Sequence, residues 1–247
     1  MPAIPYSLPR RSITSAQLLT QLGLDHGLSV EQCLRHTGLS PLQLAELHSE
    51  IEGAQELQLI CNLIEALPTQ DDLGLQAGLR YQLTTYGIWG YALLSSQSFR
   101  QAADLGLRYL DLTFAFNRIS LHEDADQAHL QLDGNHLPDQ VRDFLLLRDA
   151  VAVMVIQREL TGKRMPLDRV QLSMPAPADT ARFIEQFGLL PEFACAENRI
   201  SFPVTCSICP CPALIRTALS SANSNARPCW PNVRCAAVWP GRFVIVC

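Results

Sequence analysis

Cysteines near the C-terminal end are the residues best able to do chemistry in this sequence. Six of the nine cysteines fall in the last 42 residues, at Cys206, Cys209, Cys211, Cys229, Cys235 and Cys247. Cys206 and Cys209 have the spacing of a zinc-binding thiolate pair, and Cys229 with Cys235 could complete a four-thiolate site. A zinc ribbon normally repeats the close pair, but five residues separate Cys229 from Cys235. We therefore predict no metal site and keep a stand-alone metal or redox protein as the alternative interpretation.

The motifs of common enzymes are absent from the sequence. No GxGxxG, Walker, HExxH or GxSxG pattern occurs, so the commoner nucleotide and hydrolase sites have no support. His122, Glu123 and Asp124 are adjacent, but a polar triplet at an expected hairpin turn is typical of a solvated loop. Ser95 and Ser96 have no base nearby in the sequence and are typical of a helix end and cap. We predict no catalytic residues, no cofactor and a protein that is not an enzyme.

A charge-free, aromatic-rich run at residues 85–96 is the best candidate for a binding surface. On a helix, Gly87 and Gly90 would form a groove for close backbone approach, while Trp89 and Leu93 would face a core. Such a helix is either part of the core or the wall of an apolar ligand pocket.

Arg80 precedes this run and places one guanidinium near an apolar wall. That combination suits a small anionic or zwitterionic ligand. We therefore predict that Arg80, Tyr86 and Trp89 contact a small molecule. The alternative, that Tyr86 and Trp89 simply fill the core, stays open for each of them.

Helical signals dominate the first half of the chain. Residues 1–13 contain three prolines and are expected to form a flexible arm. Ser29 and Ser40 are each followed three residues later by Gln, which is the spacing of a helix capping box. Further helices are expected at residues 53–67, at residues 73–80, through the run at 85–96, and after Ser98.

The periodicity then changes to that of strands. A hairpin is expected within residues 112–132, with a polar turn at 123–126, and residues 138–161 form the longest helix, begun by Pro138 and ended by Gly162. Residues 14–202 are therefore expected to form an α+β domain, with a helical N-terminal part packed on a small antiparallel sheet with crossover helices. The remaining elements expected in this domain are a strand at 169–173, a helix at 178–187 and short strands at 192–194 and 199–202.

The net charge of −5 is unevenly distributed. Residues 203–247 hold four of the 19 basic residues and no acidic one, so residues 1–202 carry 15 basic and 24 acidic side chains, a formal charge of −9. An acidic body argues against binding to a phosphate backbone by this part alone. No apolar run approaches the roughly 20 residues that span a bilayer, and the start lacks a signal-peptide pattern. We expect a cytoplasmic protein without a membrane partner.

Several segments together resemble the N-terminal effector domain of AraC-type (AraC/XylS) transcriptional regulators, in the branch often labelled arabinose-binding. The most specific of them is the block centred on Tyr-Gly-Ile-Trp-Gly at residues 86–90. The likeness covers about residues 10–202. The segments that carry it are residues 22–39, 75–80, 86–96, 175–177, 187–188, 191–193 and 197–198.

The resemblance implies a regulatory function. In that family the effector domain answers to small molecules such as amino acids and supports dimerisation, and a C-terminal pair of helix-turn-helix motifs reads DNA. It therefore implies a small-molecule effector, such as an amino acid or a similar metabolite, and a homodimer.

Residues 203–247 depart from the family pattern. They contain six prolines, no acidic residue and no helical period, so nothing in them resembles paired helix-turn-helix motifs. Back-translated and read one base earlier, residues 207–212 permit Asp-Leu-Pro-Leu-Pro, which looks like the family's continuation. We expect residues 203–247 to be an irregular Cys/Pro-rich tail read out of frame. On that reading the chain is truncated before its helix-turn-helix domain, and specific DNA binding is lost with it.

Overall fold

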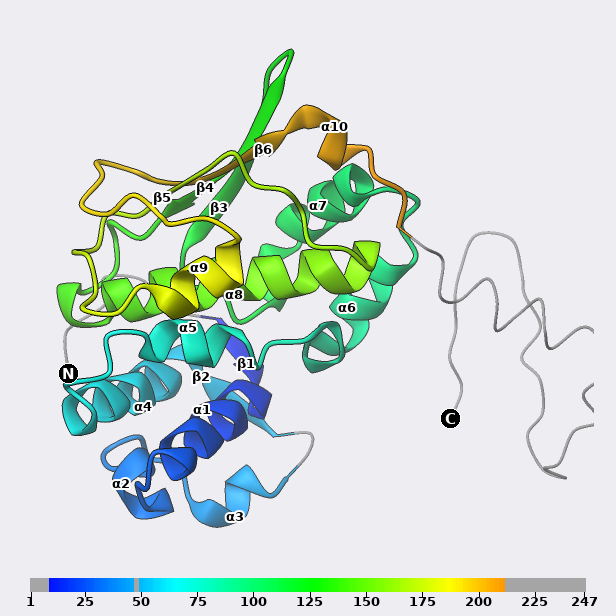
Figure 1. The fold of residues 1–247 in the computed structure, drawn as a ribbon. Coiled ribbons are helices and arrows are strands. Elements are labelled where there is room, and N and C mark those ends of the chain that lie inside the picture. The colour runs from blue at the N-terminus through cyan, green and yellow to red at the C-terminus, as the bar shows by residue number, and fades with distance from the viewer. Residues whose placement is uncertain (1–8, 47–48, 212–247) are drawn as a thin grey trace, which may run out of the picture. The chain divides into compact units, whose positions relative to one another are not determined.

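The long helix α8 (Asp139–Thr161) is the element on which the other parts of the fold pack (Figure 1). The computed structural model describes residues 9–46 and 49–211, all within the first of two units into which the chain divides, Met1–Ala213. Pro138 precedes α8, and Gly162 ends it in the left-handed conformation with φ of 69°, so both predicted ends are confirmed. Apolar residues along this helix are buried, among them Val141, Phe144, Leu145, Val151, Met154 and Val155.

Short helices and one two-stranded ribbon form the N-terminal part. Ser29 and Ser40 make the capping boxes that their spacing predicts. Within the span expected to be a flexible arm, β1 pairs antiparallel with β2, so Arg11 lies opposite Ile51. The elements are β1 (Arg10–Ser12), α1 (Thr14–Asp25), α2 (Val30–Leu34), α3 (Pro41–Leu44), β2 (Glu50–Glu52) and α4 (Gly53–Ala66).

The aromatic run forms a short helix as predicted, with Trp89 and Leu93 buried. Gly90 permits close approach, because a Cβ atom there would lie 2.0 Å from the carbonyl oxygen of Leu83. Gly87 does not line a groove with Gly90; no atom lies near its Cβ position, and its φ of +52° is what favours glycine. The elements of this stretch are α5 (Leu73–Gly78), η1 (Leu83–Tyr86), α6 (Gly87–Leu94), α7 (Phe99–Arg108) and η2 (Leu110–Leu112).

A four-stranded antiparallel sheet covers the other side of α8, in the order β3-β4-β6-β5. The predicted hairpin is confirmed as β3 and β4. The strand expected at residues 192–194 does not form; Glu192 makes only an isolated bridge with Gln171. The strands are β3 (Arg118–Glu123), β4 (Gln127–Asp133), β5 (Arg169–Gln171) and β6 (Asn198–Pro203), joined by α9 (Ala181–Phe187) and followed by α10 (Val204–Ser207).

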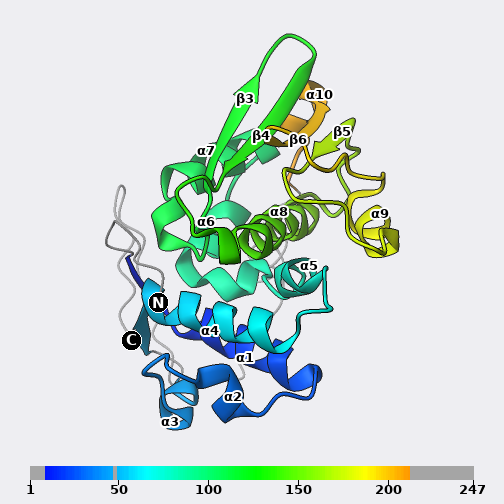
Figure 2. The same cartoon turned by 90° about the vertical axis from the view of Figure 1, so that its left-hand side faces the viewer.

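Helix α8 contributes to two hydrophobic cores. Its first turns, including Val141 and Leu145, pack with α1 and α4, whereas its later turns pack with the sheet and α6. Figures 1 and 2 both show α5, α4 and α1 on one side of α8 and the sheet on the other. The N-terminal helices therefore reach the sheet through α8 instead of packing on it directly.

The architecture is α+β, as the sequence predicts. None of the helices in residues 9–46 and 49–211 combines the length and the apolar character needed to cross a bilayer. Past the expected boundary at residue 202, α10 packs beside β4 and Cys211 is buried. The rest of the expected irregular tail lies outside the described residues, so its character stays a prediction.

Candidate functional site

A fully buried ion network ties α8 to the N-terminal part. The Arg148 guanidinium donates to Glu56 at 2.9 Å, to Asp149 at 2.8 and 2.9 Å, and to the carbonyl oxygen of Phe114 at 2.6 Å. Arg11 pairs with the second Glu56 oxygen at 3.3 Å. Burial alone would lower the pKa of Arg148, but Asp149, Tyr81 and Glu56 raise it, so the guanidinium stays charged.

The same network fixes the segment before β3. One Asp149 oxygen accepts hydrogen bonds from the backbone nitrogens of Phe116 and Asn117 and from the Asn117 side chain, at 2.8 to 3.1 Å. Ser15 donates to Glu56 and shares a 2.6 Å hydrogen bond with the Tyr81 hydroxyl. Burial raises the pKa of Tyr81 to about 12, so its hydroxyl stays protonated at neutral pH.

Tyr86 and Trp89 line a small cavity above this network, which we call the aromatic pocket. Their rings lie 5.0 Å apart, and Tyr86 lies 5.4 Å from Phe114. Arg148 and Asp149 also line the cavity, whose volume is about 40 Å³. A neighbouring apolar cavity of about 70 Å³ shares Trp89. Both volumes are well below the roughly 300 Å³ at which small-molecule sites begin.

Arg80 lies away from these aromatic residues. Its guanidinium pairs with Asp25 at 2.5 Å and stays partly exposed, and Arg80 lines neither of the two cavities that Trp89 lines. The structure therefore brings Tyr86 and Trp89 together but places Arg148, not Arg80, beside them. The sequence did not identify Arg148 as a residue of this pocket, because the sequence of a long helix does not show which other elements bury a charged residue in it.

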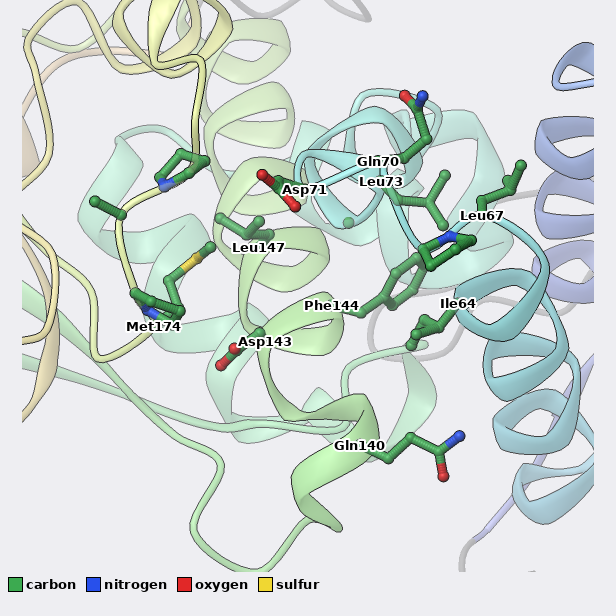
Figure 3. A pocket seen from close by; sticks show the side chains of 15 residues that line it. Ile64, Leu67, Gln70, Asp71, Leu73, Gln140, Asp143, Phe144, Leu147 and Met174 are labelled. Atoms are coloured by element: carbon green, nitrogen blue, oxygen red, sulfur yellow. The ribbon is translucent and has the colours of Figure 1, made fainter.

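A larger cavity, which we call the α5–α8 cleft, has a volume of about 310 Å³ (Figure 3). Ile64 of α4 and Leu73 of α5 form one wall, Phe144 and Leu147 of α8 form the floor, and the segment 174–177 forms the far rim. The cleft thus lies between α4 and α5 on one side and the segment 174–177 on the other, with α8 beneath it. Its volume falls in the range of small-molecule sites.

The polar groups of the α5–α8 cleft are acidic or uncharged. Asp71 and Asp143 line it together with Gln70 and Gln140, and no basic side chain does. Figure 3 shows the two carboxylates on either side of Leu147. Partial desolvation raises the pKa of Asp143, against the lowering effect of Arg142. The sequence signal that could have identified the cleft is the Pro175-Ala176-Pro177 break, which forms its rim.

The structure describes only two of the four cysteines in the proposed zinc or redox site. Cys206 and Cys209 are free thiols at and after α10, while Cys229 and Cys235 lie outside the described residues. Across residues 9–46 and 49–211, no group of three or more potential metal-ligating side chains gathers.

Comparisons with known proteins agree on one kind of domain. The family model described as the arabinose-binding domain of AraC transcription regulator, N-terminal, matches residues 27–210. An HTH-type transcriptional regulator of Mycobacterium tuberculosis is 27% identical over 203 residues, which cover 78% of this chain and 58% of the relative. The ornithine utilization regulator of Pseudomonas aeruginosa is 26% identical over 192 residues, or 77% and 56% of the two chains.

A solved structure has the same fold. The transcriptional regulator CdpR from Pseudomonas aeruginosa superposes with a TM-score of 0.56 at 19% identity, covering 81% of this chain and 58% of that chain. The present chain spans somewhat more than half the length of the curated relatives it matches.

Proposed function

The chain belongs to the family of arabinose-binding N-terminal domains of AraC-type transcription regulators, and on that premise we propose that it senses a small effector bound in the α5–α8 cleft. The observation that supports this placement is the volume of the cleft, about 310 Å³, together with its apolar floor. The cavities around Trp89 have volumes of only about 40 and 70 Å³. The family is one of regulators acting on promoters, so we assign the chain no catalytic role and place it in the cytoplasm.

The position of the cleft supports a signalling role. Its walls come from α4 and α5 on one side of α8 and from the segment 174–177 on the other. A ligand that contacts both sides favours the arrangement in which they close, and it shifts the population by its difference in affinity between the open and closed arrangements. In an intact regulator, that shift would change how the dimer presents its DNA-binding domains.

We take the effector to be an amino acid or a similar metabolite. One relative bears the name ornithine utilization regulator, and a cleft of this volume accommodates a molecule of that size. Ornithine and the common amino acids, added singly, form the first set of probes in a thermal-shift assay. We expect at least one of them to raise the melting temperature.

A blocking variant tests the location of the site. Ala176 lies exposed on the rim, so Ala176→Trp places an indole in the cleft without disturbing the core. Ala178→Trp is the matched control, because Ala178 is also exposed but does not line the cleft. We expect the effector-induced shift to vanish in Ala176→Trp and to persist in Ala178→Trp; a shift that survives in both would refute this placement.

The sequence-based assignment of Tyr86 and Trp89 is the competing placement. Tyr86→Phe removes only a hydroxyl and leaves the ring contacts in the aromatic pocket. Effector affinity unchanged in Tyr86→Phe is the result expected from the cleft. A loss of about tenfold, the value of one hydrogen bond to a ligand, would favour the aromatic pocket.

We further propose that residues 203–247 are read out of frame. The stretch from 203 onward has no acidic residue and six prolines, and the family match, which runs past the expected boundary as far as residue 210, does not cover the rest of it. On this reading the chain lacks the helix-turn-helix domain and does not bind operator DNA specifically by itself. Resequencing the coding DNA from codon 195 onward tests it; a confirmed printed frame with nothing regulator-like downstream would reopen the metal or redox alternative.

A further inference from the structure

The charged residues that line the α5–α8 cleft are all acidic. Fifteen residues line it, and among them Asp71 and Asp143 are the only charged ones. Two carboxylates that no basic lining residue balances create a negative potential, which a low-dielectric wall strengthens. An anionic ligand group would meet repulsion here.

The Asp143 carboxylate has no paired cation in the described parts of the chain, although Arg142 is next to it. No hydrogen bond or ion pair joins the side-chain carboxylate of Asp143 to any other residue in the described parts of the chain. Arg142, next to it, is already engaged: its guanidinium pairs with Asp139 at 2.6 Å and donates to the carbonyl oxygens of Leu137 and Gly134. The neighbouring cation is therefore not aimed at the cleft.

Asp71 is similarly uncompensated. It accepts one long hydrogen bond of 3.4 Å, from the backbone nitrogen of Ala178. Arg182 pairs with the neighbouring Asp72 at 2.7 Å and not with Asp71. Both exposed carboxylates thus line the cavity and pair with no basic side chain of residues 9–46 and 49–211, while Asp72 and Asp139 near them each have such a partner.

The floor of the cleft is apolar. Phe144, Leu147 and Met174 are buried core residues that also line the cavity. An aliphatic chain lying on these side chains removes apolar surface from water. The cleft therefore combines a surface for a hydrocarbon stem with carboxylates for a positive head.

We propose that the α5–α8 cleft binds an amphipathic organic cation, with an ammonium or guanidinium group paired to Asp143 and an aliphatic stem lying on Phe144 and Leu147. Asp71 adds to the negative potential without being the main contact. This inference rests on the proposed function, because it names the charge class of the effector that the same cleft binds.

Matched ligands test the charge directly. L-lysine and L-norleucine share the same main-chain groups and aliphatic stem, and only lysine carries the side-chain ammonium. Isothermal titration of the full chain is carried out with these two, L-arginine, 1,5-diaminopentane and L-glutamate. We expect at least one of the three cations to bind, and that cation to bind at least tenfold more tightly than norleucine and glutamate.

Matched variants test the residue. Asp143→Asn keeps the shape and removes the charge, and Asp104→Asn makes the same change on the exposed face of α7, away from the cleft. We expect Asp143→Asn to weaken cation binding by about 10-fold to 100-fold, as for loss of a charged hydrogen bond, and Asp104→Asn to leave it unchanged. Equal melting temperatures of the two variants without ligand establish that both fold.

The possible failures are distinguishable. If norleucine or glutamate binds as tightly as the cations and Ala176→Trp blocks that binding, the cleft is the effector site but the charge inference is wrong. If Asp143→Asn leaves cation affinity unchanged, the assignment to Asp143 is wrong. If none of the three cations binds, the charge inference is wrong. The proposed function is then tested separately, by whether any other amino acid raises the melting temperature in the thermal-shift assay.

Discussion

At the scale of single residues, Arg148 does most to connect distant parts of the chain. Its side chain is 1% exposed, and it contacts Glu56 of α4, its own neighbour Asp149, and the carbonyl oxygen of Phe114. Charges buried this deeply are tolerated because each of the three guanidinium nitrogens donates to an acceptor. The network thereby fixes α4 and the loop before β3 relative to α8.

Replacing Arg148 with methionine should be strongly destabilising. Among the described residues, Arg148→Met leaves Arg11 as the only cation paired with Glu56 and removes the only guanidinium bonded to Asp149. We expect the free energy of unfolding in urea to fall by about 3–5 kcal/mol, as for other buried ion pairs that lose one partner. A loss below about 1 kcal/mol would contradict this account, since that is the range of surface pairs.

Arg169→Met is the control for that experiment. Arg169 makes two 2.6 Å hydrogen bonds to Glu192, but both side chains are about half exposed. Solvent screens such a pair, so we expect a change of at most about 1 kcal/mol in the same urea assay. The contrast between the two arginines isolates the effect of burial.

At the scale of elements, the crossing of α5 over α8 depends on glycine. A Cβ atom at Gly78 would lie 2.6 Å from the carbonyl oxygen of Arg148 and 2.7 Å from the Cβ atom of Val151. Gly74 approaches the backbone of Phe144 in the same way. Side chains at these positions would push apart two helices that form the wall and floor of the cleft.

Gly78→Ala should therefore lower stability, even though alanine is the better helix former. Alanine gains about 1 kcal/mol of helix propensity, but overpacking against backbone typically costs about 1–3 kcal/mol. We expect a net loss in urea unfolding and weaker binding in the cleft. Gly106→Ala on α7 should lose less, because its nearest neighbour is a Trp89 ring atom at 3.1 Å, which can shift slightly. Equal losses for both variants would show that backbone contact is not the cause.

At the scale of the whole molecule, one exposed apolar face supports the proposed dimer. Ile88 and Tyr91 are three residues apart on α6, and they are 79% and 67% exposed, although Trp89 and Leu93 of the same helix are buried. Large apolar side chains grouped on one face often mark an interaction surface. We propose that a second copy of the chain covers this face.

Sedimentation of the full chain tests that proposal. We expect a dimer for the natural sequence and a shift to monomer in Ile88→Arg, because an unpaired charge at the centre of an interface must be desolvated. Leu42→Arg is the control, since Leu42 is 80% exposed on α3, far along the chain from α6. A natural chain that sediments as a monomer, or an Ile88→Arg variant that stays dimeric, would refute the interface.

The amino-acid sequence by itself determined the α+β class, the main helices and the hairpin, but not the ribbon of β1 and β2. The ends of α8 at Pro138 and Gly162, the capping boxes at Ser29 and Ser40, and the hairpin are set by interactions within a few residues, so spacing alone predicts them. The family resemblance, carried by short segments, also needed no coordinates and was confirmed by the family match.

Only the tertiary structure decided which elements pack together. The hydrophobic periodicity predicts that Trp89 is buried, but it does not predict that Arg148 lies beside Trp89 and that Arg80 lies elsewhere. The position of Arg148 depends on its contact with Glu56, which is 92 residues away in the sequence. The α5–α8 cleft likewise joins Asp71, Asp143 and the segment 174–177, which no local pattern relates. A hydrophobic pattern fixes which face of a helix is buried, whereas the partner of that face follows from the packing of the whole chain.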